Sequence, residues 1–99
     1  MIVAVLAATL AAAGRTALAQ EGGCLSPGEM REIVAAKEVV APVIAIRAAR
    51  RAAPGADITR ARLCRSGGGY LYVLSALRRD GRFVEVTVDA SSGKVASSR

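Results

Sequence analysis

The sequence predicts a small α+β domain in which one or two N-terminal helices pack on one face of an antiparallel meander of three to four strands. Two observations favour this class. Apolar residues recur at helical spacing between residues 26 and 53, whereas from residue 58 onward they alternate with a period of two. Turn-forming residues then interrupt the chain at 66–69, 80–81 and 89–93. No linker divides the sequence, so we expect one domain.

The first 19 residues, 1–19, have the pattern of a secretory signal peptide. An uncharged apolar run precedes Ala17 and Ala19, small residues at the positions that a signal peptidase reads. The run holds about 12 apolar residues, whereas a membrane-spanning helix needs roughly 20. We therefore predict cleavage between Ala19 and Gln20 and a periplasmic or secreted protein. The usual basic residues at the start are missing, which places the true start codon in question.

The two cysteines, Cys24 and Cys64, suit a structural disulfide. An even cysteine count in an exported chain favours a disulfide, and two thiolates without any His make a poor zinc site. A redox-active pair would favour the short C-x-x-C spacing, which the sequence lacks. Closing a loop of about 40 residues stabilises a fold by roughly 4 kcal/mol in the chain-entropy model.

Residues 20–41 are expected to form an N-terminal helical segment. Ser26 and Glu29 have the spacing of a capping box, in which each side chain accepts a hydrogen bond from the amide of the other residue. Pro27 occupies the first helical position, where its missing N–H costs nothing. The helix should end before 39–41, because the residue that precedes Pro42 is pushed towards extended geometry.

A second helix is expected to begin at Pro42 and to end at Pro54-Gly55. Its two faces differ in character. Small residues that let the helix lie close to a sheet are Ala45, Ala49 and Ala52, and the opposite face carries Arg47, Arg50 and Arg51. Val43 and Ile44 do not fit the apolar stripe, so we place them against a neighbouring loop or the first helix.

The remaining sequence reads as a series of strands. The β-rich segments are ITRARLC (58–64), YLYVLSAL (70–77) and RFVEVTVD (82–89), and a last short strand begins at Lys94. Asp80-Gly81 has the sequence of a two-residue hairpin turn. Asp89 to Gly93 is a further turn, in which Gly93 is free to adopt a positive φ.

The order of these parts resembles the PepSY domain family. The phrases that carry the resemblance are AAPGADI, GGGYLYVL, DGRFVEV and above all VDASSGKV at 88–95, which matches the family pattern Val-Asp-Ala-x-x-Gly-x-Val. The resemblance covers about residues 40–97, so we assign 42–99 to a PepSY-like helix and antiparallel sheet. It implies a regulatory role, because the family is thought to bind and to inhibit or modulate peptidases and other envelope proteins. It supplies no catalytic residues.

The composition argues against an enzyme. Without His, a hydrolytic triad and a His-ligated metal site are excluded, and no Ser lies in a G-x-S-x-G context. Glu29 is explained by helix capping and Glu32 by solvent exposure. Gly67-Gly68-Gly69 joins two strands rather than opening a helix, which favours a hairpin over a phosphate-binding loop. We therefore expect no catalytic residues, no cofactor and no metal.

The basic residues and the tyrosines are the candidate binding groups. The formal net charge is +6, which is compatible with a solvated surface or with an anionic envelope partner, whereas export disfavours nucleic acid. The candidate basic residues are Arg60, Arg62 and Arg65 on the first strand and Arg78, Arg79 and Arg82 at the hairpin. Tyr70 and Tyr72 share one face of the second strand, as cover for the sheet or as anchors for a partner.

We therefore expect a non-catalytic binding module whose partner is a peptidase or another envelope protein. An exposed strand edge would also let an extended peptide add to the sheet through main-chain hydrogen bonds. The alternative is a basic structural protein that attaches to an anionic envelope surface. The sequence identifies neither the partner nor the oligomeric state.

Overall fold

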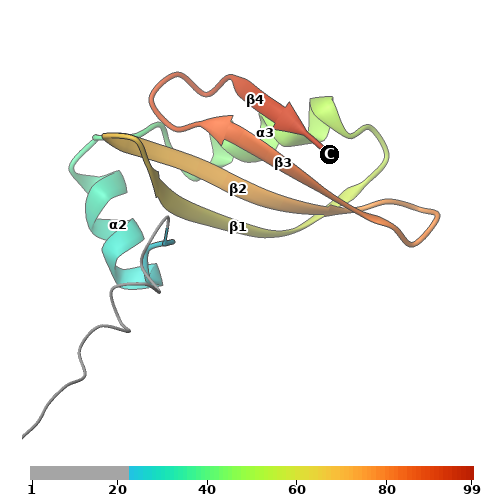
Figure 1. The fold of residues 1–99 in the computed structure, drawn as a ribbon, viewed down its shortest axis with the longest axis horizontal. Helices are drawn as coiled ribbons and strands as arrows, with labels where there is room; N and C mark the ends of the chain where they lie inside the picture. Colours follow the sequence, from blue (N-terminus) through green and yellow to red (C-terminus); the bar gives the residue numbers. More distant parts are fainter. Residues whose placement is uncertain (1–22) are drawn as a thin grey trace, which may run out of the picture.

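The computed structural model describes residues 23–99, so the predicted signal peptide and its cleavage site at Ala19 and Gln20 lie outside the described residues. Two helices pack against a four-stranded antiparallel sheet with the strand order β1-β2-β3-β4 (Figure 1). The elements are α2 (Pro27–Ala35), α3 (Pro42–Ala52), β1 (Asp57–Ser66), β2 (Gly69–Leu77), β3 (Phe83–Asp89) and β4 (Val95–Ser98). This is the predicted α+β class with all four strands of the meander. No helix within 23–99 is long and apolar enough to cross a membrane.

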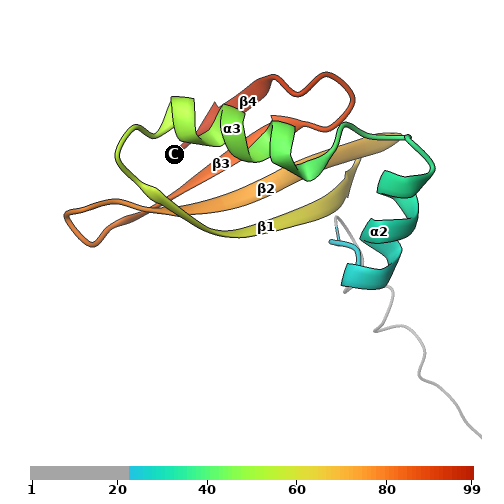
Figure 2. The ribbon, with the colours of Figure 1, turned by 180° about the vertical axis from the view of Figure 1, so that it is seen from behind.

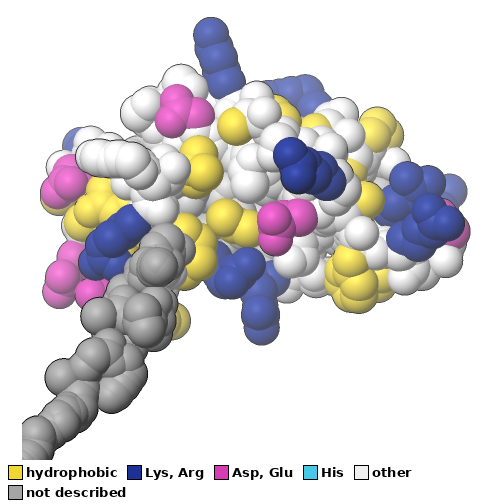
Figure 3. Space-filling view, viewed as in Figure 1, with side chains coloured by type: hydrophobic (Ala, Val, Ile, Leu, Met, Phe, Trp, Pro, Cys, Tyr) yellow, Lys and Arg dark blue, Asp and Glu magenta, His cyan; other side chains and the backbone are white. Residues whose placement is uncertain are grey.

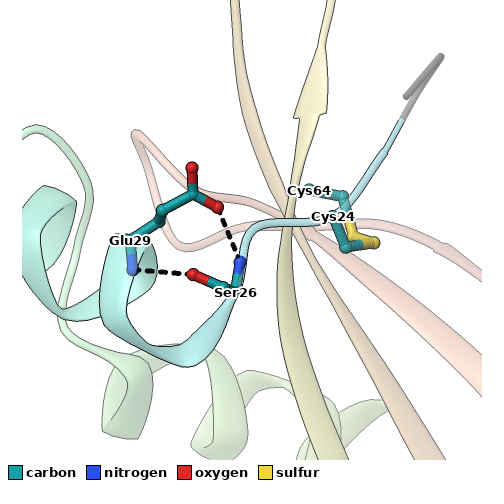
Figure 4. The surroundings of a disulfide bond; sticks show 4 residues. All are labelled: Cys24, Ser26, Glu29 and Cys64. Atoms are coloured by element: carbon teal, nitrogen blue, oxygen red, sulfur yellow. Dashed lines mark hydrogen bonds between the residues drawn. A yellow bond between two sulfur atoms is a disulfide. The ribbon is translucent and has the colours of Figure 1, made fainter. Parts of the chain in front are cut away.

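Helix α2 begins with the predicted capping box (Figure 4). The Ser26 amide donates to Glu29 Oε1 at 2.9 Å, and the Glu29 amide donates to Ser26 Oγ at 3.1 Å. These hydrogen bonds with Ser26 lower the pKa of the Glu29 carboxyl. The chain leaves the helix at Lys37, which adopts a positive φ of 58°. No residue of α2 is buried, so this helix contributes little to the core.

Helix α3 lies across one face of the sheet (Figure 2). Its buried residues are the small side chains Ala45, Ala48 and Ala49, which let the helix approach the strands closely. The side chains fully buried beneath it are Leu63, Tyr72, Leu74, Val86 and Val88. The core is therefore a single layer between α3 and the sheet, and no helix within residues 23–99 covers the opposite sheet face.

Glycines with positive φ form the turns of the first two hairpins, but the second turn differs from the predicted one. Gly67 and Gly68 both adopt positive φ, 50° and 75°, and form the two-residue turn between β1 and β2. In the next hairpin only Gly81 has a positive φ, of 87°, and the Arg78 amide donates to the Arg82 carbonyl at 2.8 Å. The predicted two-residue Asp80-Gly81 turn is therefore wrong, because that turn needs positive φ at both positions, and the loop is longer.

The disulfide joins Cys24 to Cys64 as predicted and fastens the entrance of α2 to β1 (Figure 4). Backbone hydrogen bonds flank it on both sides. The Leu25 amide donates to the Leu63 carbonyl at 2.8 Å, and the Arg65 amide donates to the Gly23 carbonyl at 3.1 Å. Gly23–Leu25 thus pairs with the outer edge of β1 near its end.

We expect the Cys24→Ala, Cys64→Ala double variant to be less stable by up to about 4 kcal/mol, because the cross-link no longer restricts the unfolded chain. Urea unfolding of the oxidised protein, the reduced protein and the double variant measures this effect. Reduced protein and double variant should unfold alike. Identical unfolding of all three, or free thiols detected by mass spectrometry in the purified, non-reduced protein, would contradict a stabilising bridge.

Candidate partner-binding surfaces

The Asp89–Gly93 turn is organised by the Asp89 side chain. Its carboxylate accepts hydrogen bonds from the hydroxyls of Ser92 at 2.7 Å and Ser91 at 3.0 Å. The backbone closes the turn, because the Gly93 amide donates to the Asp89 carbonyl at 2.8 Å. The serine hydrogen bonds, that of Ser92 foremost, lower the pKa of the Asp89 carboxyl. Asp89 therefore serves as the organiser of the predicted turn and not as a proton donor near neutral pH.

Gly93 places this turn directly against α3. It adopts a φ of 81°, and a Cβ atom at this position would lie 2.9 Å from Ile44 Cγ2. Ile44 therefore packs against a neighbouring loop, one of the two placements that we predicted. The glycine meets two demands together, a left-handed backbone and a close approach by the first turn of α3.

Tyr72 is part of the core and does not reach the surface. Its side chain is 0% exposed, and its hydroxyl donates to the Val40 carbonyl at 2.5 Å. Burial raises the pKa of the Tyr72 phenol. A second hydrogen bond attaches the segment between α2 and α3 to the sheet, because the Val40 amide donates to the Ala90 carbonyl at 2.8 Å. The prediction of Tyr72 as a partner-binding residue is therefore wrong, because α3 and the segment before it cover this side chain.

Tyr70 keeps part of its surface exposed and lies two residues along β2, on the same face as Tyr72. Arg60 and Arg62 lie on the other side of the sheet. Arg62 pairs with Val73 and therefore shares its face of the sheet. The residues on either side of Val73 in β2 are buried under α3, so Val73 and Arg62 point to the opposite face. The predicted candidate residues thus belong to two opposite faces and do not form a single site.

The sheet face that carries Arg60 and Arg62 is open to solvent (Figure 3). Phe83 on this side is 66% exposed, and the apolar side chains form separate patches between charged ones. Arg62 is half-buried, and its Nε atom has no hydrogen-bond partner among residues 23–99. This face is therefore of mixed polar and apolar character and is not a continuous apolar docking site.

The sequence analysis expected an exposed strand edge, but it did not identify β4 as that edge, and it missed the hollows beside it. Two open hollows lie between α3 and this edge of the sheet, and both include Ala52. Their basic residues are Arg51 and Lys94 in one and Arg78 and Arg79 in the other. We call these two hollows the α3–β4 groove. Its residues come from three elements, α3, β3 and β4, and from the three loops that follow α3, β2 and β3, so no local sequence pattern brings them together.

The described residues offer no cluster for metal or acid–base chemistry. No group of three His, Cys, Asp or Glu side chains within 23–99 is placed to hold a metal ion. The two carboxyls with lowered pKa values, those of Glu29 and Asp89, are both explained by local hydrogen bonds at a helix start and a turn. What the surfaces do offer is an uncovered sheet face, a free strand edge and a basic groove. The fold and its surfaces thus define a small α+β domain.

The family follows from comparison with known proteins. The sequence profile of PepSY, the peptidase propeptide and YPEB domain, matches residues 45–99. The match spans more than half of the chain, so this chain belongs to the PepSY family. PepSY domains are peptidase-propeptide-like regulatory modules that are generally non-catalytic and act in extracellular or periplasmic compartments. Searches of curated proteins and of solved structures found no match to the chain.

We expect Gly93→Ala to destabilise the fold more than Gly68→Ala. Both glycines have a positive φ, which costs about 1–2 kcal/mol for a residue with a side chain. Only Gly93 lies against Ile44, whereas a Cβ at Gly68 meets no atom within 4 Å. Overpacking should add about 1–3 kcal/mol to the Gly93 variant. Thermal unfolding of both variants measures the difference.

The double variant Gly93→Ala, Ile44→Ala separates the two causes. Shortening Ile44 to alanine removes the atom that a Cβ at position 93 would meet. Relative to Ile44→Ala alone, Gly93→Ala should then lower the free energy of unfolding no more than Gly68→Ala lowers it in the wild type. If Gly93→Ala and Gly68→Ala are equally destabilising, the close approach of Ile44 has no energetic role.

We expect Ser92→Ala to raise the pKa of Asp89 and Ser91→Ala to raise it less, because the Ser92 hydrogen bond is the larger cause of the low pKa. A lowered folded pKa gives stability that is present above the unfolded pKa of about 4 and is lost as the pH falls through the folded value. The stability difference between wild type and Ser92→Ala should therefore shrink in strong acid. Carboxyl-carbon NMR titration and unfolding at several pH values test this, and an unchanged Asp89 pKa would contradict it.

Proposed function

We propose that this protein is a non-catalytic exported PepSY module that binds and modulates a peptidase or another envelope protein. The observation that carries the proposal is the PepSY match over 45–99, which spans most of α3 and the whole sheet. The chain has no His, and the shifted carboxyls of Glu29 and Asp89 already serve the helix cap and the turn. Action by binding is therefore better supported than turnover, and the proposal includes no cofactor.

Export is supported by two independent features. The pattern of residues 1–19 is that of a cleavable signal peptide, with Ala19 and Gln20 at the cleavage site. The Cys24–Cys64 disulfide suits an oxidising compartment. We therefore propose that the protein acts in the periplasm or the extracellular medium.

A second candidate function is attachment to an anionic envelope surface. The observation that favours it is the gathering of basic side chains at the β2–β3 hairpin end of the molecule (Figure 3). The exposed residues of this hairpin include Arg78, Arg79 and Arg82. Such attachment depends on long-range attraction, whereas a shape-specific protein interface depends mainly on contact. The two functions therefore differ in their response to salt.

We expect the exported protein, immobilised through an N-terminal tag, to capture an envelope peptidase or another envelope protein and to retain it in 1 M salt, where the Debye length is about 3 Å. A captured peptidase should change its rate of substrate cleavage when the purified protein is added. The protein alone should cleave no peptide. The outer-face variant Arg60→Ser, Arg62→Ser reports whether this face is the one in contact.

Capture that vanishes at 1 M salt, together with binding to phosphatidylglycerol vesicles, would favour the anionic-surface function. Peptide cleavage by the purified protein, or failure to capture any protein at either salt concentration, would refute the proposed function.

A further inference from the structure

Strand β4 presents unpaired backbone groups along the edge of the sheet. Glu85 and Arg99 exchange two backbone hydrogen bonds, of 2.8 and 2.9 Å. In an antiparallel ladder such pairs alternate with pairs whose N–H and C=O groups point away from each other. Val86 and Ser98 are the next pair, so the backbone groups of Ser98 point outward from the sheet. No segment within 23–99 pairs with this edge.

The other edge of the sheet is partly closed. Gly23–Leu25 pairs with β1 at Leu63 and Arg65, and the disulfide holds it there. Ser98 and Ala96 are both exposed, and Val95 is 41% exposed. Within the described part of the chain, β4 is therefore the more accessible edge for an added strand.

The α3–β4 groove lies next to this edge on the helix side of the sheet. The hollow near the hairpin has a volume of about 620 Å³ and is bordered by Ser98 and by Arg78 and Arg79. The second hollow has a volume of about 430 Å³ and is bordered by Arg51 and Lys94. The small side chain of Ala52 borders both, so the hollows adjoin along α3.

The groove carries an excess of positive charge. Its single carboxylate is that of Asp80, which lies 3.4 Å from Arg78 in an ion pair. The ion pairs found within residues 23–99 do not include the other three basic residues of the groove, which are Arg51, Arg79 and Lys94. These three side chains are available to an anionic ligand.

The side chain of Ser98 lies on the same face of the sheet as the groove. Paired residues in a sheet point to the same face, and Ser98 pairs with Val86, which is buried under α3. The residue of an added strand opposite Ser98 would therefore direct its side chain towards the groove.

We propose that the α3–β4 groove binds an extended acidic segment of a partner protein, which adds to β4 as a fifth strand. Main-chain hydrogen bonds to Ser98 hold the segment at the edge, and carboxylates at alternate positions reach Arg79 at one end and Arg51 and Lys94 at the other. This inference rests on the proposed function, since it names the chemistry of the partner. A lipid surface fits less well, because a flat anionic surface cannot enter a hollow or complete a strand edge.

The test uses a defined probe, a fluorescein-labelled peptide of four Glu-Val repeats with both ends blocked, and measures binding to the full exported protein by fluorescence anisotropy. The matched variants are Arg51→Ala, Arg79→Ala in the groove and Arg60→Ala, Arg62→Ala on the opposite sheet face. Each pair removes two positive charges. We expect the groove pair to weaken binding at least about tenfold and the opposite pair to weaken it less than about threefold.

A second measurement tests the strand addition. Ser98→Pro removes the outward N–H without breaking a bond to β3, so it should weaken peptide binding about tenfold while circular dichroism stays unchanged. In the unmodified protein, hydrogen exchange at the Ser98 amide should slow at least about tenfold when the peptide is added. This exchange measurement does not depend on whether the proline variant folds.

Four outcomes would overturn the inference: equal weakening by both arginine pairs, equal binding of a Lys-Val peptide, unchanged exchange at Ser98, or binding to phosphatidylglycerol vesicles without binding to the peptide. Its failure is distinct from failure of the proposed function. If a peptidase is captured but the acidic peptide does not bind, only the groove is wrong. If the peptide binds but no envelope protein is captured, the groove stands and the proposed function fails.

Discussion

The segment between the two helices is hydrogen-bonded to the sheet at Val40, and the position of α3 depends on this attachment. The Val40 carbonyl accepts the buried Tyr72 hydroxyl, and the Val40 amide donates to the Ala90 carbonyl at the end of β3. Pro42 then starts α3 two residues later, so the helix begins at a defined height above the sheet. Ile44 and Gly93 meet as a result. An unpaired phenol in this core would be costly, which ties the core to the connecting segment.

Much of the fold could be predicted because its signals are local. The Ser26–Glu29 box and the Asp89–Gly93 turn each depend on residues within five positions of one another. The error at the Asp80-Gly81 turn was local, because the loop is longer than the two residues that its sequence indicates. The error at Tyr72 arose because distant segments decide the outcome. Tyr72 reads as a surface tyrosine until the segment around Val40 is placed over it. The α3–β4 groove combines residues of α3, the β2–β3 hairpin and β4, so its charge and shape exist only in the folded chain.

Helix α2 differs from the other elements in burial and in its relation to the family match. It buries no residue, and it lies outside the range 45–99 that defines the family. Its partly buried side chains, Met30, Ile33 and Val34, pack against the core without being enclosed in it. The disulfide on one side and Val40 on the other hold it in place. In this chain the PepSY match covers most of α3 and the four strands, and α2 is a separately fastened N-terminal helix outside the match.

The pairing of Gly23–Leu25 with β1 also bears on self-association. Copies of one chain can stack edge to edge into open-ended filaments only if each presents two complementary free edges. Here a short segment covers the end of one edge, and the Cys24–Cys64 bond prevents it from detaching. Head-to-tail growth through β4 and the covered part of β1 is thereby blocked. The Cys24–Cys64 bond therefore keeps the end of the β1 edge paired with its own chain in addition to cross-linking the fold.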